Sequence, residues 1–160
     1  MTTDYGFSMI FNSYVPTYQL PPFLGQDIPV VLKLDSAGNI EWSRKINPIV
    51  NADYSGRYPV LQSCACTKDG GCAILGYSDS MDRAGAAIYN SRAFFLIKLD
   101  NKGNILLSKT CRISEAISST GLTYFGDLLP LNDGGFLFDY ADQFTGAIVL
   151  CRLNNKANIV

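Results

Sequence analysis

Residues 31–42 read VLKLDSAGNIEW, and this stretch decides the fold. It is a hydrophobic run, a short polar turn and a second, half-apolar run, which is the pattern of two β-strands joined by a turn. The same pattern returns as FLIKLDNKGNILL at residues 95–107 and, with more changes, as VLCRLNNKANIV at residues 149–160. The chain is therefore predicted to consist of copies of one unit that contains this hairpin.

A second motif repeats with the same period. Residues 67–78 read TKDGGCAILGYS, residues 131–140 read LNDGGFLFDY, and residues 3–11, TDYGFSMIF, hold a weaker copy. The interval from Asp4 to Asp69 in this motif equals the interval from Lys33 to Lys98 in the first motif, and the interval from Asp69 to Asp133 is nearly the same. Because Asp and Gly both tolerate the positive φ of a tight turn, each copy predicts a β-hairpin.

Both kinds of turn depend on small and polar residues. In the Asp-x-x-Gly-Asn turns, the glycine is expected in the left-handed conformation. Alanine replaces this glycine at Ala157, at a cost on the order of 1 kcal/mol, so we expect a distorted turn there. The predicted turn residues are Asp35, Gly38, Asn39, Asp69, Gly70, Gly71, Asp100, Gly103, Asn104, Asp133, Gly134 and Gly135.

One unit contains four predicted strands, named a to d in chain order. The middle unit is complete, the first lacks strand a, and the last has a truncated strand d. The predicted units cover about residues 1–47, 60–112 and 125–160 of a single domain, residues 1–160. The strands are expected at about 7–13, 29–34 and 39–46, then 61–67, 72–78, 93–99 and 104–110, then 126–131, 136–140 and 147–153.

The apolar pattern selects among all-β folds. Residues 94–97, FFLI, and 30–32, VVL, are continuously apolar, whereas a half-exposed antiparallel strand alternates. Continuous runs indicate that both faces of the sheet are covered, as in the blades of a β-propeller. The small residues SCAC at 63–66 suit an innermost strand. We therefore expect a β-propeller-like fold of about three four-stranded antiparallel blades, with an ordinary β-sandwich as the alternative.

The two motifs resemble the propeller repeats of many bacterial and archaeal extracellular proteins. The resemblance rests on KLDxxGNxxW at residues 33–42 and TxDGG at residues 67–71, and the first motif is also distantly similar to the repeats of quinoprotein-type propellers. It implies that Trp42 seals one blade against the next, although Leu107 stands at the equivalent place in the second unit. It also implies a cell-surface or secreted protein. The N-terminal residues MTTD, however, lack the basic start and apolar centre of a secretory signal, and the odd number of cysteines, five, leaves the compartment open.

Composition excludes several classes of function. The net charge is −1, with 13 basic and 14 acidic residues and no basic stripe, so we expect no nucleic-acid partner. The apolar runs are too short for a membrane span. The chain has no histidine, which excludes a Ser-His-Asp triad. The cysteines, at 64, 66, 72, 111 and 151, are interpreted as buried small residues rather than redox or metal ligands.

We therefore expect no cofactor, metal or catalytic residue, and the sequence favours a protein that is not an enzyme. Two weaker possibilities are a glycosidase-like pair of carboxylates among Asp79, Asp82 and Glu115, and calcium binding at Asp35 or Asp100. Solvated loop acids and turn capping explain these residues more simply.

Function is expected at the end of the fold that carries the long connections, about residues 14–28, 47–60, 79–92 and 111–125. Tyrosine and arginine are favoured anchors of recognition surfaces. The candidate ligand-binding residues are Tyr54, Arg57, Tyr89 and Arg92. The predicted function is a non-catalytic binding or structural module for protein or glycan. The alternative is a fragment of a propeller enzyme, either a quinoprotein-like oxidoreductase or a glycosidase, whose active site lies outside this chain.

Three units are fewer than the roughly 4–8 blades of a closed propeller. The missing blades are expected either from the same, longer chain or from self-association of this one. The sequence favours a segment of a longer chain, and self-association is the alternative.

Overall fold

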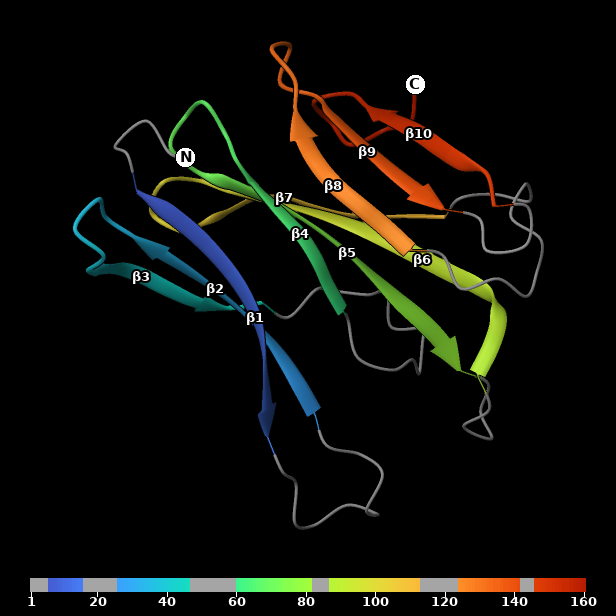
Figure 1. Ribbon diagram of the computed structural model, residues 1–160, viewed down its shortest axis with the longest axis horizontal. Helices are drawn as coiled ribbons and strands as arrows, with labels where there is room; N and C mark the ends of the chain where they lie inside the picture. The colour runs from blue at the N-terminus through green and yellow to red at the C-terminus, as the bar shows by residue number, and fades with distance from the viewer. Residues whose placement is uncertain (1–5, 16–25, 47–59, 82–86, 113–123, 142–145) are drawn as a thin grey trace.

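The computed structural model describes residues 6–15, 26–46, 60–81, 87–112, 124–141 and 146–160. They form ten β-strands in three antiparallel sheets, and within each sheet the strands pair in chain order (Figure 1). The part of the chain described here contains no helix that is long and apolar enough to cross a membrane.

The sheets follow one another along the chain. The first contains β1 (Phe7–Val15), β2 (Gln26–Leu34) and β3 (Ile40–Lys45). The second contains β4 (Val60–Cys66), β5 (Cys72–Met81), β6 (Ala87–Leu99) and β7 (Ile105–Arg112). The third contains β8 (Tyr124–Pro130), β9 (Phe136–Ala141) and β10 (Ile148–Leu153). A bridge between Leu153 and Ile159 adds the beginning of a further strand to the third sheet.

The all-β prediction is confirmed, and the strands lie close to their predicted positions. One predicted connection, at residues 79–92, is wrong because β5 continues to Met81 and β6 begins at Ala87. Past an irregularity after Ser78, these strands pair again, Ser80 with Ile88 and Met81 with Ala87. The polar residues of this segment are typical of a loop in the sequence. Strand pairing, however, requires only hydrogen bonds between backbone groups, so polar side chains do not prevent it.

The second sheet lies between the other two and is covered on both faces. On one face Ala73, Leu75, Phe94 and Leu96 pack against the third sheet, and on the other Cys72, Ile74, Phe95, Ile97 and Leu99 pack against the first. All nine side chains are buried. Phe94 meets Phe138 of β9, with ring centroids 5.0 Å apart. The continuous apolar runs of the sequence thus supply two cores, one on each side of the second sheet.

β1, β4 and β8 lie side by side where the three sheets meet (Figure 1). The Cys64 thiol of β4 donates to the Ser8 carbonyl oxygen of β1 over 3.6 Å, and the Leu128 amide of β8 donates to the Ser63 hydroxyl of β4 over 3.1 Å. The small side chains of β4 allow this close approach from both sides.

The turn at Ala157 is regular, so the prediction of a distorted turn is wrong. Ala157 adopts φ 55° and is fully buried. The Asn154 amide donates to the Asn158 carbonyl oxygen over 2.9 Å, as the Asp35 amide does to the Asn39 oxygen in the first sheet. The alanine accepts the left-handed conformation, and its methyl group joins the core between the second and third sheets.

Candidate functional site

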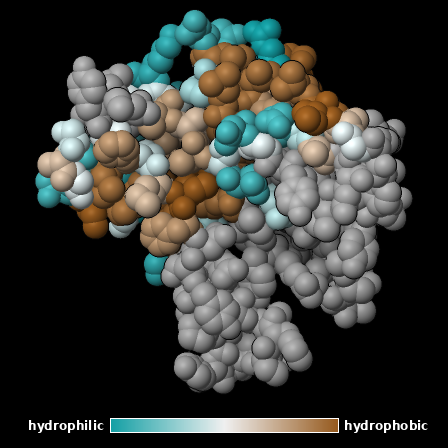
Figure 2. Space-filling model, viewed as in Figure 1, coloured by the Kyte–Doolittle hydropathy of each residue, from teal (hydrophilic) through white to brown (hydrophobic). Residues whose placement is uncertain are grey.

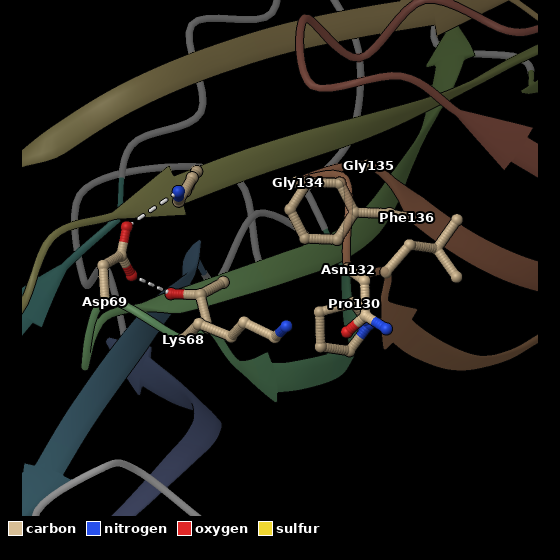
Figure 3. A pocket seen from close by; sticks show the side chains of 10 residues that line it. Lys68, Asp69, Pro130, Asn132, Gly134, Gly135 and Phe136 are labelled. Atoms are coloured by element: carbon tan, nitrogen blue, oxygen red, sulfur yellow. Dashed lines mark hydrogen bonds and ion pairs between the residues drawn. The ribbon is translucent and has the colours of Figure 1, made fainter.

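A cleft separates two equivalent turns of the second and third sheets. The β4–β5 turn, residues 67–71, forms one wall, and the β8–β9 turn, residues 131–135, forms the other. The cleft has a volume of about 300 Å³. Figure 3 shows Lys68 and Asp69 on one side and Pro130, Asn132 and Phe136 on the other.

The repeated Asp-Gly-Gly sequence gives both walls the same backbone. In one turn the Thr67 amide donates to the Gly71 oxygen over 3.0 Å, and in the other the Leu131 amide donates to the Gly135 oxygen over 2.8 Å. Gly70 and Gly134 have φ of 79° and 80°, which glycine adopts without strain. Equivalent turns in neighbouring sheets therefore lie opposite each other.

Asp69 is the most strongly perturbed carboxylate of the cleft. Burial acts to raise its pKa, but the Lys98 ammonium, the Thr67 hydroxyl and the Gly71 amide together lower the pKa to about 2. The Lys98 Nζ to Asp69 Oδ2 distance is 2.8 Å. In the third sheet, the Gly135 amide and the Arg152 guanidinium, whose Nη2 lies 2.7 Å from Asp133 Oδ2, lower the pKa of Asp133. Each of the two turns thus carries an aspartate that is paired with a cation, and only the Asp69–Lys98 pair lines the cleft.

Replacing Asp69 by asparagine is expected to destabilise the protein at neutral pH but not in strong acid. A carboxylate whose folded pKa is lowered contributes stability above its unfolded pKa, 3.8, and loses that stability as the pH falls through about 2. Because the Asp69 side chain is 47% exposed, solvent screening limits the expected difference to on the order of 1 kcal/mol. The free energy of unfolding in urea at pH 6, 4 and 2 measures this difference.

The control for this prediction is Lys98→Gln, which removes the main partner of Asp69 while leaving the carboxylate in place. It should abolish part of the same pH-dependent stabilisation. If Asp69→Asn and the parent protein differ as much at pH 2 as at pH 6, the ion pair does not stabilise the turn.

The lining of the cleft is partly apolar and partly polar. Pro130 and Leu131 give it apolar surface, and the exposed Lys68 and Asn132 offer hydrogen-bond donors. The volume is at the lower end of the range for small-molecule pockets. No group of three or more His, Cys, Asp or Glu residues within the described ranges is arranged to hold a metal ion.

Cys64, Cys72 and Cys151 are protonated thiols at neutral pH. Burial raises the pKa of Cys64 and Cys151, and burial with the nearby Cys64 and Cys66 raises the pKa of Cys72 to about 12. A thiol must ionise before it attacks a substrate or binds a metal. These residues therefore fill space between the sheets.

Trp42 joins the first sheet to the second. Its indole Nε1 donates to the Asn101 carbonyl oxygen over 2.9 Å. Its ring covers Gly103, where an added Cβ would lie 3.0 Å from two ring atoms. The glycine of one repeated hairpin thus provides the flat surface on which the tryptophan of the preceding hairpin rests.

The other predicted site residues are distributed differently. Asp35 and Asp100 each accept two backbone amides of their own turn at 2.8 Å, which is a capping role. Tyr54 and Arg57 lie outside the described residues. Tyr89 and Arg92 lie in β6 and not in a connection.

The cleft was not predicted from the sequence. The two copies of Asp-Gly-Gly, at residues 69–71 and 133–135, were a signal for it, because they predict equivalent turns in neighbouring units.

No protein-family model and no curated protein sequence matches this chain.

Proposed function

We propose that this chain is a β-propeller segment that acts as a non-catalytic binding or structural module for protein or glycan. The observation that carries the proposal is the packing of the second sheet, whose two faces supply separate cores with the sheets before and after it. Sheets stacked in this way, with their innermost strands side by side, are typical of adjacent propeller blades.

The topology separates the two ends of each sheet. The short turns, such as those at residues 35–39 and 100–104, lie at one end of the sheets. At this end Trp42 contacts the second sheet, and the cleft lies between the turns of the second and third sheets. β1, β5 and β7 run from the end with the short turns toward their last strand residues at the other end of their sheets, Val15, Met81 and Arg112. A rigid scaffold that presents connections at one end is the usual arrangement of a recognition surface.

The test of this proposal is a combined alanine variant of Tyr54, Arg57, Tyr89 and Arg92. Binding of the parent chain and of the variant to a glycan microarray and to a peptide array is compared by fluorescence. The variant is expected to lose at least tenfold in binding signal, because tyrosine and arginine supply most of the energy of such surfaces. Its circular dichroism spectrum should match that of the parent.

The matched control is Lys68→Ala combined with Asn132→Ala, which alters the cleft at the opposite end. It should bind like the parent chain. Loss of binding in this control with retention in the four-residue variant would place recognition at the cleft and refute the proposed binding surface.

A further inference from the structure

The first and third sheets each leave one apolar face uncovered. We use "front face" for the face of a sheet that is directed toward the next sheet along the chain, and "back face" for the face directed toward the preceding one. Within the chain, the front face of the first sheet covers the back face of the second, and the front face of the second covers the back face of the third. The back face of the first sheet and the front face of the third have no such cover among the described residues.

The back face of the first sheet carries a row of large apolar side chains on β1. Phe7, Met9 and Phe11 are 50%, 50% and 46% exposed. Their cross-strand partners on β2 are Leu34, Leu32 and Val30, which are also only partly buried. The apolar surface therefore extends across two strands.

The front face of the third sheet is apolar in the same way. Leu129 of β8 is 56% exposed, and Ile148 and Leu150 of β10 are 73% and 68% exposed. Leu129 pairs with the partly buried Leu137 of β9, which continues the patch across the sheet. Figure 2 shows hydrophobic side chains gathered over the third sheet and again over the first. Soluble monomers rarely expose contiguous apolar patches of this kind.

The repeat relates these open faces to interfaces that already exist in the molecule. On the back face, Phe7 and Met9 occupy the repeat positions of Cys72 and Ile74, which the first sheet buries. On the front face, Leu137 occupies the repeat position of Ala73, which the third sheet buries. Each open face is thus the repeat equivalent of one partner in an interface that this chain forms twice.

The aligned hairpin motifs give the same correspondence. When KLD at residues 33–35 is aligned with KLD at residues 98–100, Leu32 matches Ile97, which is buried against the first sheet. When RLN at residues 152–154 is aligned with the same KLD, Leu150 matches Leu96, which is buried against the third sheet. The open faces therefore carry apolar side chains at the positions that the covered sheet uses for packing.

We propose that copies of this chain associate head to tail, the front face of the third sheet in one copy packing on the back face of the first sheet in the next. The interface continues the sheet-on-sheet packing within the chain. Lys45 lies in the cross-strand row of Phe11 and Val30 on the back face. The front face carries Asp139 opposite Leu150, and its Arg152 is already paired with Asp133. Two different faces meet, so the contact is heterologous and generates a ring or an open filament. The proposal does not depend on ligand binding at the other surface.

The test uses two charge substitutions, one on each face, and light scattering on a size-exclusion column. The parent chain is expected to elute as a multiple of 17.5 kDa, or as a soluble polymer. Met9→Glu places a charge on the back face, and Leu150→Glu places a charge on the front face. Because each variant then has only one face that can associate, each variant alone should be monomeric. A 1:1 mixture of the two retains one good front face and one good back face, and should give a complex of twice 17.5 kDa. The control is Leu106→Glu, which alters an exposed leucine on β7 of the covered second sheet and should associate like the parent.

The outcomes are distinct. A folded, monomeric parent chain at 100 µM overturns the proposal and leaves the two faces for blades of a different polypeptide segment. If either variant alone still forms dimers, the contact joins identical faces and the head-to-tail arrangement is wrong. A mixture that stays monomeric, with both variants folded by circular dichroism, overturns it as well.

Discussion

Phe94→Ala and Phe95→Ala are each expected to lower the free energy of unfolding by about 3–5 kcal/mol. Both side chains are 1% exposed, although they are adjacent in β6 and point to opposite faces of the second sheet. Phe94 packs between the second and third sheets, and Phe95 packs between the first and second. In a sheet with one solvated face, one of these two substitutions would be nearly neutral. Urea unfolding followed by circular dichroism measures both effects.

The control for the two phenylalanine variants is Leu106→Ala on β7. Leu106 is 56% exposed, and exposed substitutions of this kind usually change stability by less than about 0.5 kcal/mol. If either phenylalanine variant costs no more than this control, the corresponding interface between sheets does not form in solution.

Gly71→Ala is expected to destabilise the protein by about 1–3 kcal/mol or more, the usual range for overpacking. A Cβ at this position would lie 2.1 Å from the Leu99 carbonyl oxygen, a backbone atom of the paired strand β6 that has little freedom to move. The repeat offers an independent test, because a Cβ at Gly135 would lie 2.4 Å from the Leu153 oxygen. Gly135→Ala should therefore produce a similar loss, measured by the same urea unfolding.

Gly38→Ala separates crowding from backbone conformation. Gly38 has φ 86°, but an added Cβ meets no atom within 4 Å. Its substitution should cost only the left-handed conformation, on the order of 1 kcal/mol. If Gly71→Ala costs less than Gly38→Ala, close packing of the Asp-Gly-Gly turn on its neighbouring strand is not what selects glycine at position 71.

The hairpins could be predicted from the sequence because they depend on neighbouring residues. Gly38, Gly70 and Gly103 adopt the left-handed conformation that their turns require. Asp35 satisfies backbone amides two and four residues further on, as the spacing of its turn indicates. The burial of both faces of the second sheet was also predictable, since the run at residues 94–97 contains no polar position.

The candidate site was predicted less well. The length of the β5–β6 pair was underestimated, so Tyr89 was placed in a connection although it lies in a strand. The cleft also escaped prediction, because its walls come from Lys68 and Asn132, which belong to different copies of the repeat. Neither residue type has a local pattern that distinguishes a cleft wall from any other exposed turn.

The sequence by itself determined the antiparallel hairpins and the burial of both faces of the second sheet, because turn conformation and apolar periodicity act over a few residues. Only the tertiary structure decided how the sheets stack, where the ends of β5 and β6 lie, and which faces stay open. Phe7 and Ile74 illustrate the difference: both are apolar side chains on repeated strands, yet Phe7 is half exposed and Ile74 is fully buried. Burial depends on whether another sheet lies against the face, and that contact joins residues far apart in the chain.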